Sequence, residues 1–237
     1  MTLLRNHGIT APAGFKASAV DGSVAVLVNE GPDLTAAGVF TGEHPTASML
    51  WTEQVLSAGR LRAVLLHAGA AGAALSEDFA VTHRAAEILA DTLSDWGTST
   101  GAGEVAVCAT GGSAPTALSD VVAEAVHELA GGLTGGFDAA RAVAGPHVMP
   151  AQAALHHDDG WTVGGMMAGA GSMCVFSTDA IADAATLRGV LDADRESAAQ
   201  VILLASGASE ITCSPQELGT AVAAIRSDLG IQNGRHA

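Results

Sequence analysis

Aromatic and basic side chains are scarce in this sequence. Tyr is absent, and Phe and Trp together make up 3% of the 237 residues. Only 10 Lys and Arg residues stand against 25 Asp and Glu residues, so the formal net charge is −15. Because an acidic surface repels phosphate groups, neither nucleic acid nor an anionic membrane is an expected partner.

Cysteine and long apolar runs are also scarce. The cysteines, Cys108, Cys174 and Cys213, match no zinc or redox spacing, and their odd number argues against a disulfide framework. The residues around Arg5 do not resemble a signal peptide, and no unbroken run of about 18 apolar residues could span a membrane. We therefore expect a cytoplasmic protein whose buried thiols are inert.

Glycine and small apolar residues dominate what is present. There are 29 glycines, and 49% of the chain is hydrophobic against 15% charged, a balance that excludes a disordered chain. Short apolar runs alternate with helical patterns, without a linker rich in Pro or Ser. The sequence predicts a single α+β domain over residues 1–237, with helices stacked on mixed or antiparallel sheets.

The apolar periodicity also predicts individual elements. Strands are expected at Val24–Val28, Ala36–Phe40, Leu61–Leu66, Glu104–Ala109, Trp161–Met167, Met173–Ser177 and Val201–Ala205. Helices are expected at Ala47–Ser57, Ser76–Trp96, Ser119–Leu129, Asp138–Ala144, Thr178–Leu191 and Ser214–Leu229. Ser76 and Ser214 are the expected N-caps of two of these helices.

Three short stretches could carry chemistry. Thr110-Gly111-Gly112 follows a strand and could bind an anion through its backbone N–H groups, or be an ordinary turn. Ser172 follows a glycine-rich turn and could be a nucleophile if the chain were cut before it, or a plain turn serine. His156-His157-Asp158-Asp159 offers metal-ligand types, but adjacent residues of an extended segment point to opposite sides, so a surface loop without metal is the preferred interpretation.

Several segments, in their order along the chain, resemble the ornithine acetyltransferase (glutamate N-acetyltransferase) family of arginine biosynthesis. They are Gly8–Phe15, Val28–Pro32, Ala37–Thr41, Leu50–Thr52, Gly59–Val64, Val105–Gly111, Trp161–Met166, Thr178–Ala180 and Ser206–Ile211. The resemblance implies an N-terminal-nucleophile-like fold without a cofactor. It also implies a chain that cuts itself before a threonine, which then transfers acetyl from N-acetylornithine to glutamate.

The resemblance assigns roles to particular residues. Thr110 and Gly111 match the family's Thr-Gly pair, which resembles an oxyanion hole. Residues 1–171 correspond to the family's first chain after cleavage, and residues 172–237 to a shortened second chain, truncated at its C-terminus. N-acetylornithine-like or glutamate-like molecules are the implied ligands.

Departures from the family pattern predict impaired catalysis. Ala168 stands where the family has a substrate-holding lysine, and Ala151 replaces a second lysine. The stretch that carries the cleaved Ala-Thr bond is missing between Gly171 and Met173, so Ser172 is the only hydroxyl nearby.

Three interpretations follow from these departures. The chain is an impaired or inactive acetyltransferase, a non-catalytic paralogue that binds a ligand or a full-length relative, or a decaying gene copy. Uncovered sheet edges would favour a homo-oligomer or association with a full-length relative.

Overall fold

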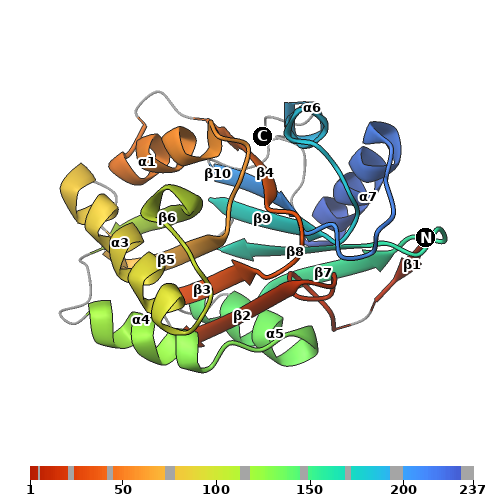
Figure 1. The fold of residues 1–237 in the computed structure, drawn as a ribbon. Coiled ribbons are helices and arrows are strands. Elements are labelled where there is room, and N and C mark those ends of the chain that lie inside the picture. The colour runs from red at the N-terminus through yellow and green to blue at the C-terminus, as the bar shows by residue number, and fades with distance from the viewer. Residues whose placement is uncertain are drawn as a thin grey trace, which may run out of the picture.

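Two β-sheets form the centre of the computed structural model (Figure 1), which describes residues 1–4, 6–20, 24–41, 45–72, 78–112, 118–144, 149–168, 172–192 and 200–230. The six-stranded sheet has the order β1 (Thr2–Leu3), β7 (Ala151–His156), β8 (Thr162–Ala168), β9 (Met173–Thr178), β10 (Gln200–Ala205) and β4 (Thr35–Phe40). The four-stranded sheet has the order β2 (Phe15–Val20), β3 (Val24–Asn29), β5 (Ala63–Gly72) and β6 (Val105–Gly112).

Both sheets are mixed. The β9–β10 and β5–β6 pairs are parallel, and the remaining pairs are antiparallel. Two parallel pairs require long crossovers, which contain α6 (Ala184–Asp192) between β9 and β10, and α3 (Phe79–Asp95) between β5 and β6. The predicted α+β class with mixed sheets is confirmed.

Helices cover the outer faces of the two stacked sheets. On the six-stranded sheet, α6 contacts β4 and β10, while α7 (Pro215–Asp228) contacts β7 and β8. On the four-stranded sheet, α4 (Leu118–His127) contacts β2 and β3, and α3 contacts β6. Helix α5 (Gly132–Val143) contacts strands of both sheets, and α1 (Ala47–Leu56) contacts β6 and β4.

The hydrophobic core follows from these layers. One cluster of buried residues joins the four-stranded sheet, its helices and the inner face of the six-stranded sheet, to which Val175, Ile202 and Leu204 belong. The alternate residues Phe176, Val201 and Leu203 point the other way and form a second cluster with α6 and α7. Both faces of β3, β9 and β10 are therefore buried, which is why these strands read as continuous apolar runs.

Helix α1 protects the edge strand β6. Trp51 Nε1 donates to Val105 O at 3.0 Å, Thr52 Oγ1 donates to Val107 O at 2.8 Å, and Thr52 Oγ1 accepts from Val107 N at 3.0 Å. An open strand edge would invite pairing with another chain, and these side chains occupy it instead.

The observed starts of three helices differ from the predicted ones. Helix α3 begins at Phe79 and Asp78 is its N-cap, so the predicted cap Ser76, which lies outside the described residues, is wrong. Helix α5 begins at Gly132 rather than Asp138. Helix α6 begins at Ala184 rather than at the predicted Thr178. Thr178 is the last residue of strand β9, and the residues after it make contacts outside the helix.

The predicted strands are confirmed, but β5 continues to Gly72 where the prediction ended at Leu66, and Thr110–Gly112, predicted as a turn, belong to β6. Helix α7 is confirmed with its cap. Ser214 Oγ accepts from Glu217 N at 3.2 Å, and Ser214 N donates to Glu217 Oε2 at 3.1 Å, which is a capping box. Strands β2 and β7 were not predicted. Among the described residues, no helix is long and apolar enough to cross a lipid bilayer.

Candidate functional site

The C-terminal end of β6 lies beside the first residue of β10. Gln200 Nε2 donates to Ala109 O at 3.4 Å, continuing the row of edge carbonyls that Trp51 and Thr52 bind further along the strand. Alternate residues of a regular strand direct their backbone groups to the same edge, so the N–H of Gly111 is expected at this edge, although the register of β5 shifts between Ala68 and Ala71 opposite it.

Gln200 also fixes the position of Ser172. Its backbone N donates to Ser172 O at 3.0 Å, and Gln200 is paired with Met173 in the β9–β10 ladder. One nearly fully buried residue thus contacts both the strand that ends in Thr110-Gly111 and the residue that begins β9. The sequence-predicted residues Thr110, Gly111 and Ser172 consequently lie at the same end of the stacked sheets.

The β8–β9 connection is short. The two strands are antiparallel neighbours, and Ala168 is paired with Met173, so residues 169–172 alone connect them. Ser172 is partly buried in this connection and keeps a backbone hydrogen bond to Gln200. Residues 169–171 lie outside the described residues, as do 113–117 after β6.

Two buried side chains at this end keep unsatisfied polar atoms. His67 is fully buried next to Ala109 in the β5–β6 ladder, and both its ring nitrogens lack a hydrogen-bond partner among the described residues. Burial lowers the pKa of His67 from its ordinary value of 6.5, so the ring is neutral at pH 7. Gln200 Oε1 is likewise buried without a partner in the described part of the chain.

The opposite end of the six-stranded sheet is organised around Asp179, in the Thr178–Ala180 segment. Its Oδ1 accepts from Thr162 N at 2.7 Å and its Oδ2 from Ala13 N at 3.1 Å. Burial raises the pKa of Asp179, and these backbone N–H groups work against that rise. The geometry describes a structural clamp, because both oxygens are occupied by main-chain donors.

The remaining candidates are placed away from Ser172. His156–Asp159 lies at the turn between β7 and β8, at the same end as Asp179. Burial raises the pKa of Cys108 to about 12 and that of Cys174 to about 12, so neither thiol forms a nucleophilic thiolate near neutral pH. The prediction of inert buried thiols for these two cysteines is thereby supported.

Sequence reasoning missed Gln200, His67 and Asp179 as organising residues. Gln200 and His67 each adjoin an apolar strand run as a single polar residue, and such a residue gives no sign of which distant strand end it will meet. Asp179 belongs to a segment noted only for its family resemblance. All three depend on tertiary contacts with residues far away in the chain.

Comparison with known proteins gives the context for this site. The ArgJ family profile matches residues 8–232. The arginine biosynthesis bifunctional protein ArgJ of Mycobacterium tuberculosis is 45% identical over 265 residues, which cover 97% of this chain and 66% of that protein. That span exceeds the 237 residues of this chain, so the relative contains residues with no counterpart here.

Solved structures agree with the sequence comparison. The crystal structure of ornithine acetyltransferase complexed with ornithine, from M. tuberculosis, is 48% identical with a TM-score of 0.66, and the match covers 72% of this chain and 95% of that chain. The l-aminopeptidase D-ala-esterase/amidase of Ochrobactrum anthropi, described as a variant of the Ntn hydrolase fold, has a TM-score of 0.55 at 12% identity over 97% of this chain and 85% of its own. This second likeness concerns the fold alone and agrees with the N-terminal-nucleophile-like prediction.

The profile match and the identity extend over nearly all of the chain, through both sheets and the β6, β9 and β10 strand ends that form the candidate site. The chain therefore belongs to the ArgJ family.

Proposed function

We propose that this chain is an ornithine acetyltransferase-like protein that keeps the acyl-binding part of the family's site and is impaired or inactive in acetyl transfer. One observation carries the proposal. The β8–β9 connection consists of residues 169–172, with Ala168 and Met173 paired across it. The family resemblance implies that a self-cleaved bond and its threonine nucleophile belong in this region.

The short connection argues against self-cleavage. Cleavage must free an amino terminus inside the site, where it can act as base for the adjacent hydroxyl. Ser172 instead leads directly into β9, and its carbonyl is bound by Gln200 N at 3.0 Å. The longer span of the M. tuberculosis relative supports the view that residues present in the family are missing here.

The loss of rate expected without the nucleophile is much larger than the contribution of one oxyanion-hole donor. Removing the nucleophile of a serine protease lowers kcat by about 10⁶-fold, whereas one oxyanion-hole donor is worth about 10²–10³. Retained donors at Thr110 and Gly111 therefore do not compensate for a missing nucleophile. They could still hold the carbonyl oxygen of a bound acyl group.

Ornithine-like amino acids are the proposed ligands. The support is that the M. tuberculosis ornithine acetyltransferase, 48% identical over the matched region, was solved in complex with ornithine. The same match covers 72% of this chain and 95% of that one. Residues 1–171 as the counterpart of the family's first chain and residues 172–237 as that of the second remain part of the proposal.

The test is intact mass spectrometry of the purified chain together with an assay of ornithine release from N-acetylornithine and glutamate. We expect a single uncut species and no release above that of Ser172→Ala, with the M. tuberculosis relative as the active control. Scission before residue 172, or an acetyl adduct on Ser172 that the Ala variant lacks, would contradict the proposal.

Binding without catalysis is tested separately. Isothermal titration with ornithine and N-acetylornithine should show saturable binding that Gln200→Leu weakens, because the substitution removes the side-chain hydrogen bond to Ala109 O beside Thr110 and keeps the backbone bond to Ser172 O. Size-exclusion chromatography with and without the M. tuberculosis relative tests the predicted association with a full-length family member or with a second copy.

A further inference from the structure

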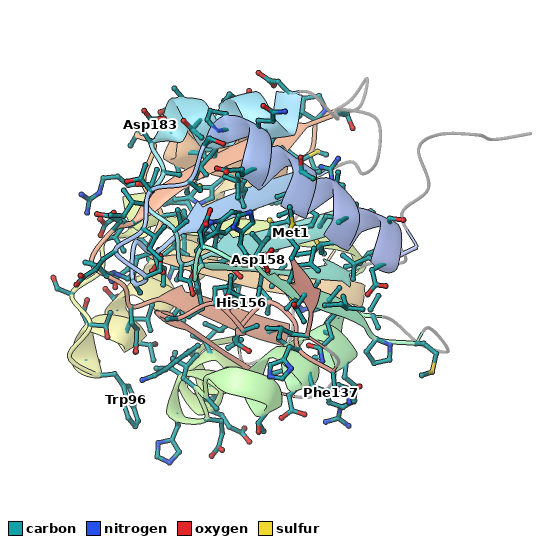
Figure 2. The ribbon with its side chains drawn as sticks, turned by 90° about the vertical axis from the view of Figure 1, so that its right-hand side faces the viewer. Met1, Trp96, Phe137, His156, Asp158 and Asp183 are labelled. Atoms are coloured by element: carbon teal, nitrogen blue, oxygen red, sulfur yellow. The ribbon has the colours of Figure 1, made fainter. Side chains whose placement is uncertain are left out.

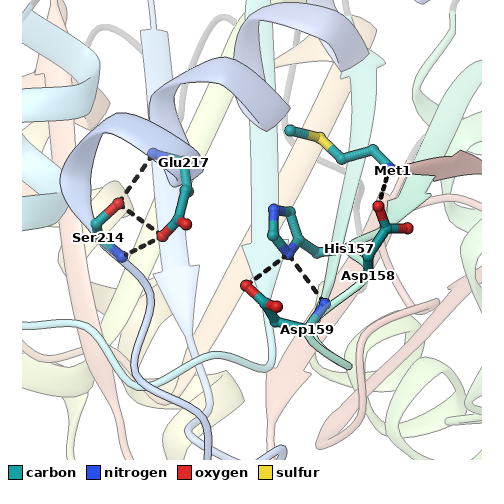
Figure 3. A network of polar contacts seen from close by, with 6 residues as sticks. All are labelled: Met1, His157, Asp158, Asp159, Ser214 and Glu217. Carbon is teal, nitrogen blue, oxygen red and sulfur yellow. Dashed lines mark hydrogen bonds and ion pairs between the residues drawn. The ribbon is translucent and has the colours of Figure 1, made fainter.

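A group of side chains of the types that bind metal ions lies at the end of the molecule opposite Ser172. His157 and Asp159 come from the β7–β8 turn, and Glu217 comes from the first turn of α7 (Figure 3). One ligand atom of each of the three side chains lies within 4.8 Å of the others. These segments are far apart in sequence and are brought together only by the packing of α7 on β7 and β8.

We propose that His157, Asp159 and Glu217 form a binding site for a divalent transition metal of the Zn²⁺ type, independent of acetyl transfer. Imidazole nitrogen and carboxylate oxygen are both ligand types that Zn²⁺ binds, and three protein ligands with a water in the fourth position is a coordination that it uses. The two carboxylates complement the charge of a divalent cation.

The imidazole is held in place by the fold. The ring of His157 stacks on Trp161, with centroids 4.6 Å apart and an interplanar angle of 13°. The turn is closed by His157 N, which donates to Trp161 O at 2.7 Å, and by Gly160 N, which donates to His157 O at 2.9 Å. A ring fixed in this way loses little freedom on binding an ion.

Each of the two carboxylates has an oxygen atom that could bind an ion. Asp159 Oδ2 already lies 3.3 Å from His157 Nδ1, and its side chain is 64% exposed. Hydrogen bonds from Ser214 lower the pKa of Glu217, so this carboxylate is ionised at neutral pH. Those bonds involve Oε2, which leaves Oε1 for a ligand.

The three ligand atoms, which lie within 4.8 Å of one another, must come closer before one ion can bind them all. Bonds of about 2.0–2.2 Å to one ion place neighbouring ligand atoms about 3–3.5 Å apart. Ligation through His157 Nδ1 would replace the hydrogen bond that this atom accepts from Asp159 N at 3.2 Å. An ion bound there would connect the β7–β8 turn to the start of α7.

The neighbouring residues of the same tetrapeptide provide matched controls, because they turn away from this group. His156 Nδ1 lies 3.1 Å from Thr162 Oγ1, and Asp158 Oδ2 accepts from the Met1 ammonium at 3.0 Å (Figures 2 and 3). Two of the four adjacent ligand-type residues therefore belong to the group with Glu217, and the other two have different partners.

The experiment is isothermal titration of the full chain with ZnCl₂, with Asp159→Asn and Glu217→Gln compared with the control Asp158→Asn. We expect one saturable site in the wild-type protein, weakened at least about tenfold in both ligand variants and unchanged in the control. Circular dichroism melts without metal confirm that each variant is folded. Zn²⁺ should raise the melting midpoint of the wild type and of Asp158→Asn only.

A second probe tests the imidazole. Co²⁺ should give a visible absorption band on binding, and His157→Ala should abolish this band while His156→Ala retains it. Absence of saturable Zn²⁺ binding, or equal binding in Asp159→Asn, Glu217→Gln and His157→Ala, would overturn the proposal.

Discussion

Polar groups are satisfied differently around Asp179 and around Gln200, which lie at opposite ends of the stacked sheets. At one end, the Asp179 carboxylate accepts from Thr162 N and Ala13 N. The backbone carbonyl oxygen of Asp179 accepts from Ser209 N at 2.9 Å. At the other end, Gln200 Oε1 and both nitrogens of His67 are buried without a partner among the described residues. Buried unsatisfied groups are rare in folded proteins and cost stability.

The largest expected effect concerns the Asp179 clamp. Replacing Asp179 with Ala leaves two main-chain N–H groups without their acceptor, and we expect the free energy of unfolding to fall by about 2–4 kcal/mol. Urea denaturation measures the change, with the exposed Asp91→Ala as control. A loss close to that of the control would show that the Asp179 end is not the stabilised one.

The second-largest expected effect concerns the hydrogen bonds between helix α1 and the edge of strand β6. Thr52→Val keeps the shape of the side chain and removes the hydroxyl that bonds both Val107 N and Val107 O. Because both groups are buried, the expected cost is about 2 kcal/mol. Thr220→Val, at an exposed position of α7, should be nearly neutral; equal losses would mean that the β6 edge is not protected by α1.

A smaller effect is expected at the start of α7. Ser214→Ala removes the oxygen that accepts from Glu217 N, and loss of an N-cap typically costs about 1 kcal/mol. Thermal unfolding should show the shift, whereas Ser227→Ala near the end of the same helix should not. A neutral Ser214→Ala would indicate that packing alone fixes this helix.

The smallest effect should have the opposite sign. His67→Leu replaces an unsatisfied buried ring with an apolar side chain, and we expect unchanged or slightly greater stability, by up to about 1 kcal/mol at pH 8. Destabilisation above pH 7 would show that His67 makes contacts that the Leu variant cannot replace.

The same substitution predicts a pH dependence. The pKa of His67 is lowered in the folded state, so the unfolded chain binds more protons below pH 6.5 and the stability of the wild type falls there. His67→Leu lacks this loss, and its advantage should therefore be larger at pH 5 than at pH 8. Urea titrations at the two pH values measure the difference, and a constant difference would contradict it.

Local sequence signals predicted some elements well. Strands β3, β9 and β10 are buried on both faces, so their apolar and β-branched residues stand out in the sequence. Strand β7 (Ala-Gln-Ala-Ala-Leu-His) has a composition that also suits a helix, and only its pairing with β8 decides its conformation. The cap of α3 was misplaced because Ser76 and Asp78 are both good N-caps, and the register of the helix on its neighbours selects between them.

The candidate site divides in the same way. Thr110, Gly111 and Ser172 were predicted from glycine-rich stretches and family resemblance, and their location at one end follows from strand order. Gln200 could not be recognised, because its contact with Ala109 joins residues 91 positions apart. The pairing of Glu217 with the His156–Asp159 stretch was missed for the same reason.

The sequence by itself determined the α+β class, the buried strands, the capping box of α7 and membership of the ArgJ family, because these rest on local periodicity, local hydrogen bonds or direct similarity. Only the tertiary structure decided which distant residues meet: Gln200 with Ala109 and Ser172 at one end, and Glu217 with His157 and Asp159 at the other. Such contacts depend on the order and register of strands, which residue types alone do not specify.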